Sequence, residues 1–334
     1  MENVFFNNRL RLSVTNKCNF SCFYCSNEGQ NHGESDFVDT KFLKKLFLRL
    51  KEEDVYIKKI NLTGGEPLLH KEIIEIVNLA SLISNEVTLN TNGSLLNFHL
   101  IDDFRKAGLN CIKFGSDNIF VRNSKPILIE ENQNIGKLKE LILYSMSILP
   151  RSSMNLVMTN FNINYFEDLL NWVIDNRVDK VEFIELIKFD FIKNKTVLKD
   201  SVNYQNLLKK YSKNFIKIQY NKNLAKYIAY HKSGITVQFA EDFCKRRVCG
   251  NLWTRLNCHG RLTPCIIYND TYNIDLKKNI TKQILLMKPL VCNLPNNFLP
   301  RNEIGELSRE DTFTRNNHVV PNNNFINEYT DIDL

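Results

Sequence analysis

Hydrophobic and polar positions follow two periods along the first part of the chain. Stretches of helix length carry apolar residues at spacings of three and four, as in Lys41–Lys51. Short apolar or alternating stretches, such as Leu10–Thr15, lie between them and have the length of strands. The predicted strands are 9–15, 57–62, 87–90, 111–114, 154–158 and 180–185, and the predicted helices are 41–51, 72–82, 95–106, 135–148 and 165–175. Strands that alternate with helices in this way predict an α/β fold with a parallel sheet and right-handed crossovers.

Polar and glycine-rich segments follow these strands. They are a cysteine-rich loop after residue 15, Gly64–Pro67, Asn90–Gly93, Gly115–Asp117 and Glu185. Parallel sheets bind their ligands at the carboxyl ends of the strands, and those ends meet at one edge. We therefore expect a single active site at that edge.

Composition and charge narrow the class of protein. The chain has 334 residues, 43% of them hydrophobic and 24% charged, which suffices for one large domain with a smaller appendage. No apolar stretch reaches membrane-spanning length and the N-terminus lacks the layout of a signal peptide, so we expect a cytoplasmic protein without a membrane partner. The net charge of +7 is mild for this length. It fits an anionic substrate, an acidic partner or an ordinary solvated surface, and it predicts no nucleic-acid binding.

Three of the nine cysteines lie close together in the run Cys18-Asn19-Phe20-Ser21-Cys22-Phe23-Tyr24-Cys25. So many cysteines in a cytosolic chain indicate metal binding or catalysis rather than disulfides. Three thiolates at this spacing can bind three irons of a [4Fe–4S] cluster and leave the fourth iron open for chemistry. A structural zinc site, a disulfide set and buried free thiols are the alternatives. Zinc usually takes four ligands with paired C-x2-C spacing, and no His or Cys follows at that distance.

A second motif, Thr63-Gly64-Gly65-Glu66-Pro67, follows the second predicted strand. Glycines at the end of a strand permit positive φ and a close approach of the backbone to a ligand. Glu66 can accept hydrogen bonds from an ammonium group. An ordinary turn before the helix near His70 is the alternative.

Together the two motifs resemble the signature of radical S-adenosylmethionine (radical SAM) enzymes. The resemblance implies an open partial (β/α)6 barrel of the TIM type, since six units fall short of the eight in a closed barrel. It implies a catalytic [4Fe–4S] cluster on Cys18, Cys22 and Cys25, whose open iron is chelated by SAM. One electron, from a donor such as a flavodoxin or ferredoxin, then cleaves SAM to a 5′-deoxyadenosyl radical that abstracts hydrogen from the substrate.

The same resemblance implies a set of SAM-binding residues. In that family the Gly-Gly-Glu-Pro segment holds the amino group of SAM, polar residues after the third and fourth strands hold its carboxylate or ribose, and the backbone of Tyr24 would contact adenine. Thr and Ser at strand ends are also common turn and cap residues. The implied residues are Tyr24, Gly64, Gly65, Glu66, Pro67, Thr91, Asn92, Ser116 and Asn155.

A second cysteine group occurs late in the chain, at Cys244, Cys249, Cys258 and Cys265. Residues 256–265 predict a hairpin that turns at His259-Gly260. The spacing resembles the half-size auxiliary-cluster ("twitch") domain, related to the SPASM domain, of many radical SAM enzymes. This implies a second [4Fe–4S] cluster on Cys244, Cys249 and Cys265, with Cys258 either a fourth ligand or a thiol on the other side of the hairpin. A structural zinc ribbon is the alternative.

The remaining cysteines and segments complete the predicted organisation. Cys111 is interpreted as a small buried hydrophobe, and Cys292 is left unassigned with a late cluster ligand as the minority interpretation. We predict a radical SAM barrel over 1–200, a helical, lysine-rich connector over 201–235, an auxiliary-cluster domain over 236–295 and an extended or disordered tail over 296–334.

Among radical SAM families, the overall likeness is to the GTP 3′,8-cyclases of molybdenum-cofactor biosynthesis, through 10–25, 59–69, 181–185 and 255–265. Arg11, Lys59 and Arg255 stand where that family places basic residues, which makes them candidate substrate contacts. However, Asn61, Glu182 and Trp253 stand where the cyclase pattern has arginines. The cyclase spacing of the auxiliary cysteines and its Gly-Gly tail are also missing.

These departures favour a substrate other than GTP, namely a peptide or a nucleoside or sugar of a specialised pathway. A GTP 3′,8-cyclase is the alternative. Two non-catalytic alternatives are an iron–sulfur redox sensor or carrier and a zinc-stabilised binding module. The Gly64–Pro67 segment argues against a sensor, because a sensor needs no loop that binds methionine.

Overall fold

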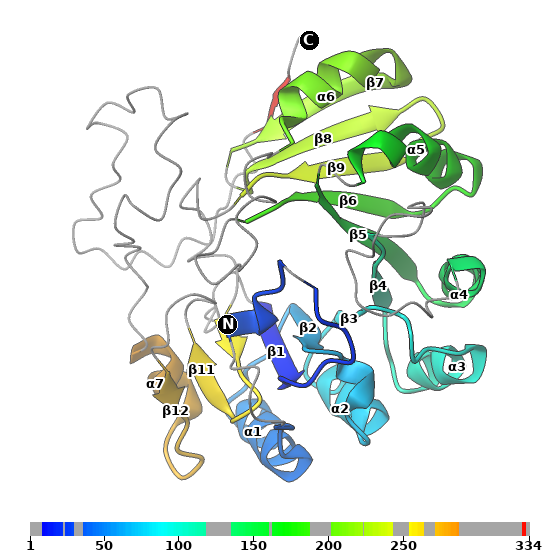
Figure 1. Ribbon diagram of the computed structural model, residues 1–334. Coiled ribbons are helices and arrows are strands. Elements are labelled where there is room, and N and C mark those ends of the chain that lie inside the picture. The colour runs from blue at the N-terminus through cyan, green and yellow to red at the C-terminus, as the bar shows by residue number, and fades with distance from the viewer. Residues whose placement is uncertain are drawn as a thin grey trace, which may run out of the picture.

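The strands of the protein form one continuous sheet (Figure 1). The computed structural model describes residues 9–22, 24–29, 36–117, 135–159, 162–187, 202–222, 224–242, 254–263, 271–286 and 329–331. Within these residues the strand order is β12-β11-β10-β1-β2-β3-β4-β5-β6-β9-β8-β7-β13.

The central part of the sheet is the expected partial barrel. Its elements are β1 (Arg9–Thr15), α1 (Thr40–Glu52), β2 (Lys59–Gly64), α2 (Ile73–Ser81), β3 (Val87–Thr91), α3 (Phe98–Lys106), β4 (Cys111–Gly115), α4 (Ile135–Ile148), β5 (Arg151–Met158), α5 (Phe166–Asp175) and β6 (Lys180–Glu185). Each neighbouring pair from β1 to β6 is parallel. Figure 1 shows helices α1 to α5 on the outer, convex side of the curved sheet. The fold class predicted from the sequence is confirmed.

Alternation along the strands separates an apolar face from a polar one. Leu10 and Leu12 on β1 and Ile60 and Leu62 on β2 are almost fully buried in the core between sheet and helices. Burying each such side chain stabilises the fold by about 1.5–3 kcal/mol. The intervening residues point to the concave side, and in β1 and β2 they are Arg9, Arg11, Ser13, Lys59, Asn61 and Thr63. The concave face is therefore polar.

Helix α3 begins later than the predicted 95–106. Asn97 has an extended backbone (φ −145°) and its Oδ1 accepts a hydrogen bond from the backbone N of Leu100 at 2.9 Å. A side-chain cap of this kind fixes the first turn of a helix. The helix accordingly starts at Phe98, although the apolar pattern extends further back.

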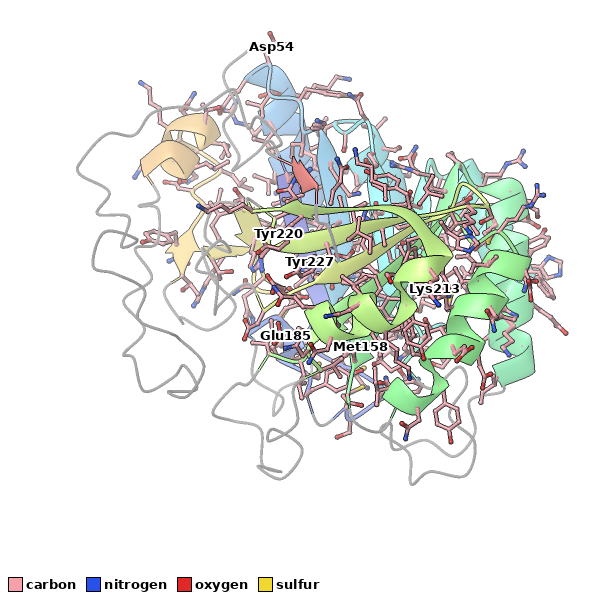
Figure 2. The ribbon with its side chains drawn as sticks, turned by 90° about the horizontal axis from the view of Figure 1, so that it is seen from above. Asp54, Met158, Glu185, Lys213, Tyr220 and Tyr227 are labelled. Carbon is pink, nitrogen blue, oxygen red and sulfur yellow. The ribbon has the colours of Figure 1, made fainter. Side chains whose placement is uncertain are left out.

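The predicted helical connector is wrong beyond its first turns. Helix α6 spans Tyr204–Tyr211, but it is followed by strands β7 (Phe215–Asn221), β8 (Lys226–His231) and β9 (Thr236–Ala240). Strands β7 and β8 form an antiparallel hairpin, and β9 pairs parallel with β6. Tyr220 and Tyr227 are register partners whose rings lie 4.7 Å apart (Figure 2). Aromatic and β-branched residues in this segment pair across strands. This pairing favours strands, although the lysine-rich composition had suggested a helix.

The C-terminal elements extend both edges of the sheet. Strand β10 (Thr254–Leu256) pairs parallel with β1 and forms the predicted hairpin with β11 (Arg261–Thr263), and β12 (Tyr272–Asn273) follows. Gly260 in the hairpin turn has φ +71°, as a tight turn requires. At the opposite edge β13 (Tyr329–Asp331) pairs antiparallel with β7, so this part of the predicted tail is a strand.

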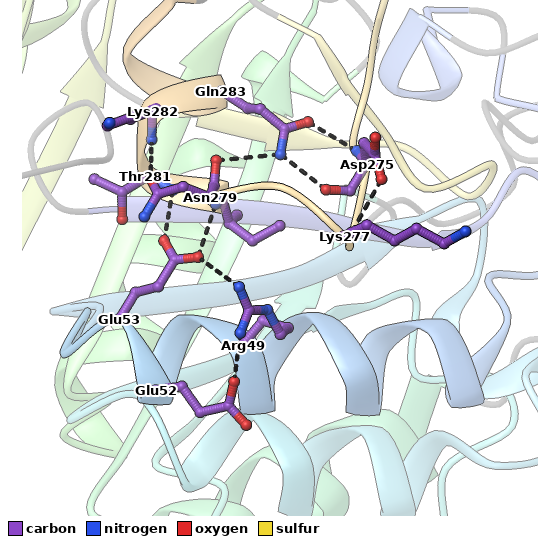
Figure 3. Close-up of polar contacts among 10 residues, drawn as sticks. Arg49, Glu52, Glu53, Asp275, Lys277, Asn279, Thr281, Lys282 and Gln283 are labelled. Carbon is purple, nitrogen blue, oxygen red and sulfur yellow. Dashed lines mark hydrogen bonds and ion pairs between the residues drawn. The ribbon is translucent and has the colours of Figure 1, made fainter.

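Helix α7 (Ile280–Leu286) is attached to α1 through one carboxylate (Figure 3). Glu53, directly after α1, accepts hydrogen bonds from the backbone N of Ile280 and of Thr281, each at 2.8 Å. Arg49 contacts the same carboxylate, with Nη2 at 3.5 Å from Oε1. No helix among the described ranges is both long and apolar enough to cross a membrane.

Candidate active site

The cysteine loop after β1 is joined to the Gly-Gly-Glu-Pro segment after β2. The backbone N of Gly65 donates to the O of Thr15 at 2.7 Å, and the N of Glu66 donates to the O of Lys17 at 2.8 Å. A Cβ on Gly64 would lie 2.1 Å from the O of Thr15, and Gly64 has φ +139°. The two backbone segments therefore approach too closely for a residue with a side chain at position 64. The glycines were predicted to allow a close approach of the backbone to a ligand. In the structure, the segment that approaches them closely is the cysteine loop.

Glu66 links β2 to β3 at the rim of the barrel. Its side chain is 1% exposed and accepts hydrogen bonds from Thr91 Oγ1 (2.7 Å) and from the backbone N of Asn92 (2.8 Å) and Leu68 (3.1 Å). Burial raises the pKa of Glu66 to about 7, although these hydrogen bonds lower it. The hydroxyl of Thr91, which was predicted to contact SAM, thus positions Glu66 and also accepts from Gly93 N at 3.0 Å.

The three cysteines of the motif lie together on this rim. The backbone N of Phe20 donates to Cys18 Sγ and the N of Asn27 to Cys25 Sγ, each at 3.3 Å. Burial raises the pKa of all three thiols, and for Cys18 and Cys22 the neighbouring cysteines raise it further. A bound metal centre lowers the pKa of coordinating thiols, so that they lose their protons. Its positive charge then offsets the repulsion between the neighbouring thiolates.

This arrangement fits an iron–sulfur cluster. Hydrogen bonds from backbone N–H groups to sulfur are among the contacts that set cluster potentials. Among the described residues, no three His, Cys, Asp or Glu side chains are arranged to hold a single metal ion. In a [4Fe–4S] cube each thiolate binds a different iron, so the ligands need not converge on one point.

The cysteine loop is also fixed to the ends of β3 and β4. Asn92 Nδ2 donates to Asn19 Oδ1 at 3.0 Å. The Tyr24 hydroxyl donates to the carboxylate of Asp117, which also accepts from the backbone N of Val157 on β5. Burial raises the pKa of Asp117 to about 7. Sequence reasoning placed Asp117 at the rim and assigned it no role, because its partner Tyr24 is far away in the sequence.

Ser116 and Asn155 meet at the neighbouring strand ends. The backbone N of Ser116 donates to Asn155 O at 3.1 Å, while its hydroxyl donates to Phe114 O at 3.4 Å. The buried Oδ1 of Asn155 has no hydrogen-bond partner in the described ranges. The predicted SAM-binding residues therefore gather on one rim, as expected, and several of their polar groups already bond to each other.

Two of the three predicted substrate contacts lie side by side on the concave face. Arg11 and Arg255 are register partners on β1 and β10. Arg11 Nε donates to Glu28 Oε2 at 2.7 Å, and its Nη2 pairs with Oε1. Burial would raise the pKa of Glu28, but Arg11 and Arg255 hold it below its ordinary value. Lys59 lies apart, at the amino end of β2, and pairs with Glu86.

Two of the three positions that depart from the cyclase pattern also lie on the concave face. Glu182 on β6 pairs with Lys226 and lies 3.9 Å (Oε2 to Nζ) from Lys180. Burial opposes ionisation of Glu182, yet these lysines hold its pKa well below the usual range. Asn61 is 1% exposed, and among the described residues neither its Oδ1 nor its Nδ2 has a partner. Trp253 lies outside the described residues.

Of the later cysteines, Cys258 is described and the predicted auxiliary ligands Cys244, Cys249 and Cys265 are not, nor is Cys292. Cys258 is buried in the β10–β11 hairpin, where burial and the nearby carboxylate of Asp36 raise the pKa of its thiol to about 11. Cys111 is buried on β4, as predicted.

Comparison with known proteins agrees with this geometry. Residues 12–173 match the radical SAM superfamily. The GTP 3′,8-cyclase of Peptoclostridium acidaminophilum is 31% identical over 270 residues, covering 78% of this chain and 80% of that protein. The GTP 3′,8-cyclase of Helicobacter pylori strain HPAG1 is 28% identical over 299 residues, covering 84% of this chain and 87% of that protein.

A solved structure shares the fold. SuiB of Streptococcus suis, bound to S-adenosylmethionine, superposes with a TM-score of 0.60 at 14% identity, over 82% of this chain and 64% of SuiB. Enzymes of the superfamily identified above use SAM and a [4Fe–4S] cluster, and the three cysteines of the rim suit such a cluster. By sequence, fold and site, the chain is an enzyme of the radical SAM superfamily.

Proposed function

We propose that Cys18, Cys22 and Cys25 hold the catalytic [4Fe–4S] cluster and that the rim around Glu66 binds SAM. When bound, the cluster and SAM supply the reductive cleavage that creates a radical able to abstract hydrogen from a substrate. The observation that carries this proposal is the attachment of the cysteine loop to the ends of β2, β3 and β4. Those contacts place three thiols and the buried carboxyl group of Glu66 at one edge.

The residues of the chain have separate tasks in this proposal. As a carboxylate, Glu66 accepts hydrogen bonds from the ammonium group of SAM, and Thr91 and Asn92 hold it in orientation. Tyr24 and Asp117 hold the cysteine loop against β4. The apolar core behind the rim keeps these groups rigid and away from bulk water.

The substrate is proposed to lie against the concave face, next to the rim, and to be a peptide or a nucleoside or sugar of a specialised pathway. Glu182 and Asn61 support this choice, since neither can bind a triphosphate as arginine would. SuiB, which shares the fold, has been crystallised with its precursor peptide SuiA. GTP 3′,8-cyclase activity is the second candidate, and it is favoured by the 31% identity to the cyclase of P. acidaminophilum.

Two further components belong to the proposal. A second [4Fe–4S] cluster, on Cys244, Cys249 and Cys265, would lie in the C-terminal part of the chain, following the cysteine spacing. A small flavodoxin or ferredoxin would supply the electron in the cell. Cys244, Cys249 and Cys265 lie outside the described residues, whereas Cys258, the possible fourth ligand, is described.

The test is formation of 5′-deoxyadenosine by anaerobically reconstituted protein with SAM and dithionite. Cys22→Ala is expected to lose SAM cleavage, about four irons per chain and about half of the cluster absorbance near 400 nm, because the proposed second cluster remains. Cys111→Ala removes a buried cysteine outside the motif and is the matched control, expected to retain all three. Wild-type cleavage in the Cys22→Ala protein would refute the proposal.

A further inference from the structure

Basic side chains outnumber carboxylates on the concave face of the barrel. The described carboxylates that contact this face are each shared by two basic residues: Glu28 by Arg11 and Arg255, Glu86 by Lys59 and Arg151, and Glu182 by Lys226 and Lys180. Each group therefore keeps an excess positive charge. A concave, partly dehydrated surface of one sign attracts anions more strongly than an open surface does.

Lys113 adds a cation that no carboxylate neutralises directly. It lies on β4, in register with Asn90 on β3 and Ser153 on β5, and its side chain is partly exposed. Within the part of the chain that the structure describes, its side chain makes no ion pair or hydrogen bond. Burial lowers the pKa of Lys113 to about 7, even though the carboxylate of Glu182 raises it. A lysine held here without a partner is suited to receive an anion.

Two amides on the same face as Lys113 have a buried oxygen that receives no hydrogen bond from the described residues. Asn61 lies on β2, and Asn90 on β3 is the register partner of Lys113. Asn61 is 1% exposed, and both of its amide atoms lack partners within the described part of the chain. Buried polar groups without partners are rare in native proteins, so these oxygens call for a ligand that donates hydrogen bonds.

We propose that Lys113, Asn61 and Asn90 form the substrate-recognition site, and that the site takes a sugar or nucleoside carrying a single phosphate. Lys113 would donate to the phosphate, and the amide oxygens would accept from the sugar hydroxyl groups. One phosphate suits a single lysine that has no ion-pair partner among the described residues, while the basic residues around Glu28, Glu86 and Glu182 add a positive field without a free donor. The inference rests on the proposed function, since it assumes that the substrate binds on the concave face.

The test is calorimetric binding to the full chain, reconstituted anaerobically and loaded with SAM. The probes are ribose 5-phosphate, ribose as its neutral counterpart, and triglutamate as a carboxylate-bearing peptide. Ribose 5-phosphate is expected to bind more tightly than ribose, and Lys113→Gln to weaken it by about tenfold or more. Asn61→Asp, which adds a negative charge, is expected to weaken it similarly. Lys44→Gln, on the outer surface of α1, should leave the affinity unchanged.

Equal binding of ribose and ribose 5-phosphate, or unchanged affinity in both Lys113→Gln and Asn61→Asp, would overturn the proposal. Lys113-dependent binding of triglutamate without binding of ribose 5-phosphate would also overturn it, in favour of an acidic peptide. Thermal melts of each variant show whether it is folded. Reductive SAM cleavage by the same wild-type preparation is measured in parallel. Its absence would count against the proposed function, while the binding data still decide the recognition site.

Discussion

Two buried carboxyl groups hold the rim of the barrel together. Glu66 ties β2 to β3 through Thr91 and Asn92, and Asp117 ties β4 to the cysteine loop through Tyr24. Burial raises the pKa of both carboxyl groups to about 7. Groups with such values change charge near neutral pH, so the rim should respond to pH in that range.

SAM affinity is predicted to rise with pH through the ionisation of Glu66. Below pH 7 the carboxyl group is mostly protonated and attracts an ammonium group weakly, and above pH 7 it is mostly ionised. The affinity should therefore increase by about tenfold between pH 6 and pH 8. Calorimetry on cluster-loaded protein would measure this rise. Glu66→Gln should bind weakly with a flat profile, whereas Glu75→Gln, on the exposed side of α2, should behave as wild type.

Tyr24→Phe is predicted to destabilise the protein by about 1–3 kcal/mol, because Oδ2 of the buried Asp117 carboxyl group loses its donor, while Oδ1 still accepts from the backbone N of Val157. Urea unfolding of cluster-free protein would measure the loss. Tyr144→Phe is the matched control, since it removes a Tyr–Asp hydrogen bond to Asp102 (Oη to Oδ1, 2.9 Å) near the surface. Equal losses in the two variants would contradict the structural role of Tyr24.

At the scale of elements, a single side chain connects α1 to α7. Glu53 accepts both backbone hydrogen bonds from the start of α7, and Arg49 orients it (Figure 3). The first N–H groups of a helix lack partners within the helix, so a carboxylate there is stabilising.

Glu53→Ala is predicted to lower the free energy of unfolding by about 1–2 kcal/mol, because two N–H groups of α7 lose their acceptor. Thermal or urea unfolding would measure the change. Glu52→Ala is the control: Glu52 contacts the same Arg49 but is 62% exposed, and its removal should change stability by less than about 0.5 kcal/mol. An equal loss of stability in Glu52→Ala would show that the effect of Glu53→Ala does not come from the two hydrogen bonds to the start of α7.

The elements of the barrel could be predicted because their periodicity is strong and local. Helix α4 and strand β6 have the predicted bounds. Strands β7 and β8 could not be predicted in the same way, since the pairing of Tyr220 with Tyr227 outweighs the composition of the segment. The cysteines and Glu66 could be singled out as candidates because their motifs are contiguous in sequence. Glu28, Asp117 and Lys113 were missed, because their roles depend on partners from distant strands.

At the scale of the molecule, the last third of the chain borders both sides of the barrel. Strands β10 to β12 continue the sheet beyond β1, and β9, β8 and β7 continue it beyond β6. Cys258 lies on the first of these extensions, in the hairpin next to the start of the cysteine loop. The proposed auxiliary cluster would be coordinated by cysteines from this part of the sequence.

Anaerobically reconstituted wild-type protein is predicted to hold about eight irons per chain, and Cys265→Ala about four, because the auxiliary cluster would lose a ligand. Iron and sulfide analysis would measure both. Cys111→Ala should match the wild type, since Cys111 is buried in β4 as a small apolar residue. A wild-type content of about four irons would remove the second cluster.

The pairing of β13 with β7 protects one edge of the sheet. Residues 329–331 cover the backbone of 219–221, which would otherwise be the open border of the sheet. Unpaired strand borders recruit strands from other molecules. A protein shortened by a premature stop or by proteolysis just before Tyr329 would keep its iron-binding loop and its concave face, yet it would tend to self-associate through β7. Loss of solubility in such a protein would therefore originate far from the chemistry.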